Sequence, residues 1–94
     1  MKYFDWDKEK NVRLKSEREV CFEDVQIAVE DGRLLDVIKH PNKKKYPNQQ
    51  VMIVEIESYV YVVPFVGDEE KYFLKTVYPS RKMTKKYLVE RSLK

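Results

Sequence analysis

The chain has 94 residues, of which 43% are hydrophobic, and this predicts a single domain, residues 1–94, with one core. One cysteine, one histidine and two glycines exclude an internal disulfide and a Gly-rich phosphate loop, and leave too few ligands for a zinc cluster. The formal net charge of +3 is uneven, because residues 1–35 and 36–70 each carry −2, whereas residues 71–94 carry +7 from eight basic and one acidic side chains.

Two helices are expected in the first third of the chain. The first covers residues 8–15 and begins after Asp5 or Asp7, either of which is a suitable N-cap. The second covers residues 22–31, and Gly32 stands at the usual stop position. The apolar residues that recur at helical spacing in this second segment are Phe22, Val25 and Val29.

The sequence pattern in the middle of the chain predicts strands. Leu34–Lys39 predicts a short strand, and His40–Asn48 has the composition of a loop. Gln50–Val66 is almost entirely β-branched and aromatic but too long for one strand. Because Glu57–Ser58 is the only adjacent polar pair in this run, a hairpin turn is expected there. Pro64 cannot donate a ladder hydrogen bond, so the second arm is expected to be an edge strand or to bulge there.

The last quarter is expected to form a strand and a basic helix. Residues 67–70 predict a turn, residues 71–78 a strand, and Pro79 its end. The helix is expected from Thr84, which is a candidate N-cap. Its expected apolar contacts are Met83, Tyr87 and Leu88. The pattern predicts an α+β fold with two N-terminal helices, about four mostly antiparallel strands and a C-terminal helix, the helices covering one sheet face.

No predicted element contains the roughly 20 consecutive apolar residues that cross a bilayer. The first residues, Met1–Asp5, lack the apolar stretch of a signal peptide. A single cysteine also fits a reducing compartment. We therefore expect a cytoplasmic protein that needs no metal or other cofactor and does not associate with a membrane.

Cations gather where the last strand meets the last helix. Arg81 and Lys82 follow the strand end, where backbone N–H groups at a helix start and an arginine fork both favour phosphate oxygens. Lys85 and Lys86 come one turn later and extend the basic surface. The pattern favours a polyanion such as RNA. A solvated basic face, or a docking surface for an acidic protein, explains the same charges.

Lys75 and His40 are candidate catalytic side chains. Strand alternation places Lys75 on the face of Phe73 and Val77, where a lysine either protects a sheet edge or points inward as a catalytic cation. His40 stands at a strand end, and histidine titrates near neutral pH, which suits proton transfer. The alternative for His40 is an ordinary surface or capping residue.

Further RNA contacts are expected from the loop after His40 and from tyrosine rings that stack on bases. These candidates are Lys43, Lys44, Lys45, Tyr46 and Tyr78, with Tyr87 as a further ring. A solvated loop and half-buried core tyrosines are the alternatives. Cys21, at the start of the second helix, is either a small buried filler or a thiol of low pKa.

Three segments carry a family resemblance. Residues 4–11, FDWDKEKN, resemble the F-x-W-D-x-x-K-N opening of the BrnT-type toxins of bacterial toxin–antitoxin modules. Residues 22–25, FEDV, look like the S-F-E-E-A segment of that family's second helix, and residues 73–84, FLKTVYPSRKMT, look like its last strand and the S-A-R-R-A-T that follows. A subgroup with H-P-N…K-Y-P-N-Q, V-P-F and F-L-K-T…P-S-R-K-x-T-K-K-Y is more similar, and residues 40–87 contain all of these.

The resemblance implies a compact RelE-like fold and a metal-independent endoribonuclease. It also implies a cognate antitoxin that neutralises the toxin and binds DNA, with a heterotetramer as an expected assembly. Arg81 and Lys82 occupy the positions of the family's basic pair, although Lys82 replaces an arginine and loses its bidentate fork. Cys21 replaces a capping serine, which predicts a less satisfied helix start. Glu57–Ser58 replaces Asn-Gly, which predicts a less favourable hairpin turn.

The expected mechanism is attack of an RNA 2′-hydroxyl on the adjacent phosphorus. Arg81 and Lys75 would stabilise charge on the phosphate oxygens, and His40 or a tyrosine would move the proton. The lysines expected to hold the RNA backbone are Lys43, Lys44, Lys45, Lys82, Lys85 and Lys86. Two alternatives fit the same composition: a non-catalytic protein-interaction module and a nucleic-acid-binding module.

Overall fold

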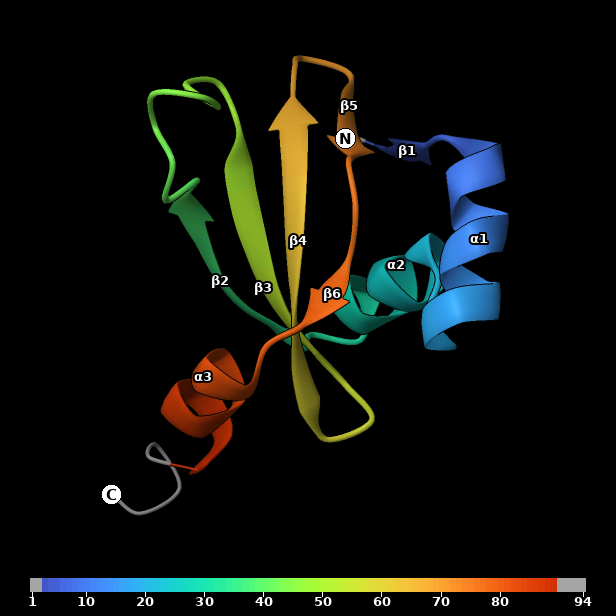
Figure 1. Ribbon diagram of the computed structural model, residues 1–94. Helices are drawn as coiled ribbons and strands as arrows, with labels where there is room; N and C mark the ends of the chain where they lie inside the picture. The colour runs from blue at the N-terminus through green and yellow to red at the C-terminus, as the bar shows by residue number, and fades with distance from the viewer. Residues whose placement is uncertain (1–2, 90–94) are drawn as a thin grey trace.

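A computed structural model describes residues 3–89 and has an α+β fold built on one six-stranded, mostly antiparallel sheet (Figure 1). The elements in chain order are β1 (Tyr3–Trp6), α1 (Lys8–Arg18), α2 (Phe22–Glu30), β2 (Leu34–Lys39), β3 (Gln50–Ile56), β4 (Tyr59–Gly67), β5 (Lys71–Leu74), β6 (Tyr78–Pro79), α3 (Arg81–Thr84) and the π-helical turn η1 (Lys85–Val89). The strand order is β1-β5-β4-β3-β2, and β6 also pairs with β4. Among the described residues, no helix is both long and apolar enough to cross a membrane.

The N-terminal prediction is confirmed for α1 but omits β1. Asp7 is the N-cap of α1, because its carboxylate accepts a hydrogen bond from the Lys10 N–H at 3.0 Å. The helix continues to Arg18 and ends at Glu19, whose φ of 58° is left-handed. β1 is the one parallel strand of the sheet and lies beside β5. Its four residues are too few to show a clear alternation in sequence.

The start of α2 is well satisfied even though its N-cap is Cys21. The Phe22 N–H donates to Oδ1 of Asn11, on α1, at 2.7 Å. The Cys21 N–H donates to the Asp24 carboxylate at 3.0 Å. Cys21 itself makes no side-chain cap bond to the helix, as its replacement of serine predicts, but Asn11 and Asp24 satisfy the Phe22 and Cys21 N–H groups instead. Burial raises the pKa of the Cys21 thiol, so Cys21 is a buried filler rather than a thiol of low pKa.

The β3–β4 hairpin turns at Glu57–Ser58, as predicted. Both residues have positive φ, 53° and 65°, which a two-residue hairpin turn of type I′ requires. Both faces of the hairpin are covered, which explains why the run from Gln50 to Val66 is apolar without alternation.

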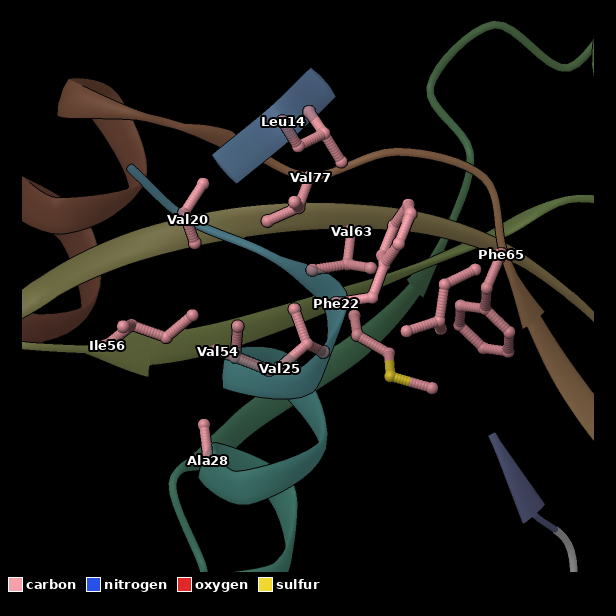
Figure 2. Packing of buried hydrophobic residues seen from close by; sticks show 12 residues of the cluster. Leu14, Val20, Phe22, Val25, Ala28, Val54, Ile56, Val63, Phe65 and Val77 are labelled. Atoms are coloured by element: carbon pink, nitrogen blue, oxygen red, sulfur yellow. The ribbon is translucent and has the colours of Figure 1, made fainter. Parts of the chain in front are cut away.

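Helices cover both faces of the sheet, which corrects the expectation of a single covered face. In Figure 1, α1 and α2 lie on one side of the sheet and α3 on the other. The first face packs under α1 and α2, and Figure 2 shows this cluster, with Phe22 surrounded by side chains from helices and strands. Its buried members are Leu14, Val20, Phe22, Val25, Ala28, Met52, Val54, Ile56, Val63, Phe65, Leu74 and Val77. The second face carries Val51, Ile53, Val60 and Val62 under the C-terminal segment.

Pro64 lies in β4, between β3 and β5, so the prediction of an edge strand is wrong. The alternative prediction, a bulge in this arm itself, is also wrong, because β4 pairs with β3 without a register shift and the bulge lies in the neighbouring segment. The Lys75 N–H donates to the Pro64 carbonyl at 2.8 Å. In a regular antiparallel pair, residue 64 would donate a hydrogen bond in return, but proline has no N–H. The ladder therefore stops at this point.

Register on either side of Pro64 shows the bulge. Leu74 is opposite Phe65, and Tyr78 is opposite Val62. An unbroken ladder from Leu74 would place Val77 opposite Val62, so the strand contains one extra residue. Because one extra residue reverses the alternation, Val77 turns into the core, where it is fully buried.

The bulge corrects two expectations for residues 71–78. The segment forms two strands, β5 and β6, rather than one. Lys75 and Val77 do not share a face, because Val77 joins the first-face cluster, whereas Lys75 is exposed on the second face beside Phe73.

The C-terminal helix begins three residues before the predicted start. Ser80 is the N-cap, and its Oγ accepts from the Met83 N–H at 3.1 Å. Thr84 instead ties the helix to the sheet: its hydroxyl donates to the Ser80 carbonyl at 2.7 Å and accepts from the Val60 N–H at 2.9 Å. The predicted apolar contacts are confirmed for Met83, Tyr87 and Leu88.

We expect Ser58→Gly to stabilise the fold. A non-glycine residue in the left-handed region costs about 1–2 kcal/mol, of which the greater freedom of glycine in the unfolded chain offsets about 0.5–1 kcal/mol. The net gain should be about 0.5–1 kcal/mol in a urea unfolding experiment. Ser16→Gly, within α1, is the matched control and should lower stability by about 0.5 kcal/mol. A loss of stability in Ser58→Gly would contradict the turn geometry.

The ion pair between β1 and β5 should make stability depend on pH at both extremes. Lys71 Nζ lies 3.2 Å from Asp5 Oδ2. The Lys71 hydrogen bond, helped by the Trp6 N–H, lowers the pKa of Asp5, and the bond to Asp5 raises the pKa of Lys71. The ion pair therefore stabilises the folded state fully at pH values between the ordinary aspartate pKa of 3.8 and the ordinary lysine pKa of 10.5.

Thermal unfolding of Asp5→Asn checks this. Its Tm should be lower than that of the wild type at pH 7, and the difference should disappear as the pH falls below 3.8 or rises above 10.5. Glu69→Gln, in the exposed turn before β5, should show no such pattern. A Tm difference that is constant across the whole pH range would contradict the assignment.

Candidate nucleic-acid interface

A hollow of about 390 Å³, here called the central hollow, lies between the β2–β3 loop and the bulged segment after β5. Pro64 of β4 lies between its two sides, which come from the β2–β3 loop and from the bulged segment after β5. The residues that line it are Lys10, His40, Tyr46, Gln49, Pro64, Lys75, Thr76 and Tyr78. The charged side chains in this lining are all basic, so the hollow favours an anion.

His40 is held in one orientation at the edge of the central hollow. Its backbone N–H donates to the Gln49 carbonyl at 3.1 Å, and its Nδ1 accepts from the Asn42 N–H at 3.0 Å. Its ring packs against Tyr46 with centroids 4.5 Å apart. Because Nδ1 is an acceptor, the neutral ring carries its proton on Nε2. His40 is therefore prepared to donate a hydrogen bond to an anionic oxygen rather than to take up a proton at Nε2.

Lys75 is a cation on an anchored backbone. Its N–H is bound to Pro64, and two residues later the Val77 carbonyl accepts a hydrogen bond from Arg18 Nη1 at 2.8 Å. The Lys75 ammonium lies 5.1 Å from the centroid of the Phe73 ring, within cation–π range. The side chain itself is exposed, so its charge is available to a ligand in the central hollow.

Two tyrosine rings flank these polar groups. Tyr78 is 39% exposed, and Tyr46 is half-buried beneath the Lys45 ammonium, which lies 5.3 Å from its centroid. Both rings line the central hollow and offer apolar surface for a base.

A second hollow of about 290 Å³, the loop hollow, continues the first. His40, Tyr46 and Gln49 line both. The remaining residues of the loop hollow are Lys39, Lys43, Pro47, Asn48 and Gln50. Lys43 is thereby placed next to His40, whereas the neighbouring Lys44 and Lys45 are exposed in the loop and line neither hollow.

The structure separates Arg81 from Lys75. The Ser80 N–H donates to the Val60 carbonyl, and the Lys75 N–H donates to Pro64, four residues further along β4. At about 3.3 Å per residue, these anchor points are roughly 13 Å apart. Arg81 lines neither hollow and is exposed on α3. The other exposed cations of this C-terminal surface are Lys82, Lys85 and Lys86.

Sequence reasoning overlooked Lys10, Gln49 and Thr76, which also line the central hollow. Lys10 is half-buried on α1, in a segment of net negative charge, so the charge count hides it. The K-N pair in the opening motif was the available signal for it. Gln49 ends the K-Y-P-N-Q motif and Thr76 ends the F-L-K-T motif, so the motif resemblance was the available signal for both.

A hollow of about 560 Å³ lies between α1 and α2. Its polar side chains cap α2: Asn11 donates to Glu23 at 2.5 Å, and the Cys21 N–H donates to Asp24. The bond from Asn11 lowers the pKa of the Glu23 carboxyl. Because acids and Lys15 are mixed in this lining, it lacks the uniform charge of the central hollow.

Comparison with known protein families, with curated proteins and with solved structures finds no match to this chain. The resemblance to BrnT-type toxins therefore stays a prediction from motifs. Within residues 3–89, no three His, Cys, Asp or Glu side chains are grouped closely enough to hold a metal ion.

We expect Arg18→Met to loosen the segment that carries Lys75. Removing the bond to the Val77 carbonyl should cost about 1 kcal/mol locally. Hydrogen–deuterium exchange of the Lys75 amide should then quicken about fivefold, since 1 kcal/mol corresponds to that factor. Arg13→Met removes a charge from the same helix and serves as the control. Equal exchange rates in the two variants would show that Arg18 does not anchor this segment.

Proposed function

We propose that this chain is a metal-independent endoribonuclease, the toxin of a bacterial toxin–antitoxin module with a RelE-like fold. The nuclease assignment is supported by one observation: an oriented histidine, an anchored lysine and two tyrosine rings line a hollow whose charged side chains are all basic. The toxin role, the cytoplasmic location and the antitoxin partner are supported by the motif resemblance.

The reaction follows from the chemistry of RNA. The 2′-hydroxyl oxygen forms a bond to the adjacent phosphorus, the bond from phosphorus to the 5′-oxygen breaks, and a 2′,3′-cyclic phosphate results. Negative charge on the non-bridging oxygens increases in the transition state. Lys75 and the Nε2–H of His40 are suited to stabilise that charge, because the Lys75 backbone and the His40 ring are both anchored by hydrogen bonds.

Two protons must also move: one leaves the 2′-hydroxyl, and one reaches the 5′-oxygen. For His40 to accept the first at Nε2, it would have to give up its bond from Asn42. The phenol hydroxyls of Tyr46 and Tyr78 also line the central hollow and can donate a proton. We therefore assign donation of a proton to the 5′-oxygen to a tyrosine and charge stabilisation to His40, while the proton of the 2′-hydroxyl passes to solvent water.

Arg81 and the lysines around it take a different role from Lys75. Because the anchor of their segment on β4 is roughly 13 Å from the anchor of Lys75, we assign these cations to phosphates that flank the scissile one. Arg81 thus remains a phosphate ligand, but it stabilises the bound strand rather than the reacting group.

Incubating the purified chain with a defined RNA in EDTA tests the proposal. Cleavage should give 5′-hydroxyl and cyclic phosphate ends, and a fully 2′-O-methylated RNA of the same sequence should stay intact. Lys75→Met should lower the cleavage rate about 100-fold or more, the usual loss for one charge-stabilising donor. Lys15→Met, on α1 and outside the central hollow, is the matched control and should cleave at the wild-type rate.

Other results would contradict either the nuclease or the position of its active site. RNA binding that weakens with salt, without cleavage, would identify a nucleic-acid-binding module. Neither binding nor cleavage would favour a protein-interaction module. Cleavage that Lys75→Met leaves unchanged would move the active site away from the central hollow.

A further inference from the structure

A fourth hollow, here called the helix hollow, has a volume of about 220 Å³ and lies along α1. Its lining consists of Lys10, Arg13, Leu14, Glu17, Arg18 and Thr76. Lys10 and Thr76 also line the central hollow, so the two adjoin along a shared edge.

The helix, central and loop hollows are linked in series by shared lining residues, and together they are called the groove here. The helix hollow adjoins the central hollow through Lys10 and Thr76, and the central hollow adjoins the loop hollow through His40, Tyr46 and Gln49. The groove therefore runs from α1, across the bulged segment, to the β2–β3 loop. It joins parts of the chain that are far apart in sequence.

Basic side chains occur along the whole groove. The cations that line it are Lys10, Arg13, Arg18, Lys39, Lys43 and Lys75, and Glu17 is its one carboxylate. Three of these cations come from α1, in the part of the chain whose net charge is −2. The fold thus gathers positive charge in a line that the sequence distributes over separate segments.

We propose that the helix hollow is a phosphate subsite for single-stranded RNA that extends beyond the central hollow. The choice of RNA as ligand rests on the proposed function, but the subsite does not require cleavage. Arg13 is exposed on α1, and its planar fork suits phosphate oxygens. Arg18 donates one N–H to the Val77 carbonyl. Because a guanidinium has five N–H donors, other N–H groups of Arg18 can bind a phosphate.

The aromatic rings in the middle of the groove favour RNA over an acidic peptide. His40, Tyr46 and Tyr78 place rings between the cations of α1 and those of the loop. A single strand presents phosphates at regular intervals and bases that stack on such rings. An acidic peptide would match the cations but leave the rings without a planar partner.

Salt-dependent binding of 2′-O-methylated RNA tests the subsite, because this RNA cannot be cleaved through its 2′-oxygen. Fluorescence anisotropy would compare oligomers of about 4 and about 12 nucleotides, within the usual range of single-strand site sizes. For the longer oligomer, Arg13→Gln should reduce the slope of log affinity against log salt by about 0.7. This corresponds to about fivefold weaker binding at about 0.1 M salt. The shorter oligomer, bound at the central hollow, should lose less.

Lys15→Gln is the matched control, because it removes one charge from the same helix but lines only the hollow between α1 and α2. It should bind the longer oligomer like the wild type. An unchanged slope in Arg13→Gln, with RNA still bound, would overturn the subsite and leave the nuclease proposal intact. Binding of polyglutamate in place of RNA, lost in Arg13→Gln, would overturn RNA as the occupant. RNA binding with the expected slope but no cleavage of unmodified RNA would support the subsite and contradict the nuclease.

Discussion

A proline inside a central strand determines the shape of this molecule's candidate site. Pro64 accepts the Lys75 N–H but has no N–H to return, so the ladder between β4 and its neighbour cannot continue. The segment between β5 and β6 contains one extra residue, which reverses the alternation of side chains between the two sheet faces. Val77 then completes the core under α1, whereas Lys75 and Tyr78 both line the central hollow.

The two sides of the central hollow are held by different means. On the β5–β6 side, backbone bonds to Pro64 and from Arg18 fix the segment that carries Lys75. On the β2–β3 side, the Asn42 N–H and the Tyr46 ring fix His40. The hollow therefore exists before any ligand binds, which is the condition under which fixed charges stabilise a transition state most strongly. The groove beyond it extends the same basic lining to α1.

Local patterns predicted most of the elements but not the site. Asp7, Gly32 and the polar pair Glu57–Ser58 acted through their immediate neighbours, so their helix start, helix stop and turn could be predicted. Pro64 indicated a bulge in its own strand, whereas the register shows that the extra residue lies in the neighbouring segment and separates Val77 from Lys75. The structure brings His40 and Lys75 to one hollow, whereas Arg81, expected beside them from its motif position, lines neither this hollow nor the loop hollow. The place of Lys10 in the central hollow could not be predicted, because it depends on how α1 packs against the sheet.

The most direct test of this account is where RNA contacts the protein. A two-dimensional ¹H–¹⁵N NMR titration with a short 2′-O-methylated RNA would report this residue by residue. The account expects the largest shift changes at the amides of residues 75–78 and of His40 and Gln49, on the two sides of Pro64. Changes confined to α3 and η1 around Arg81, or to the hollow between α1 and α2, would contradict it.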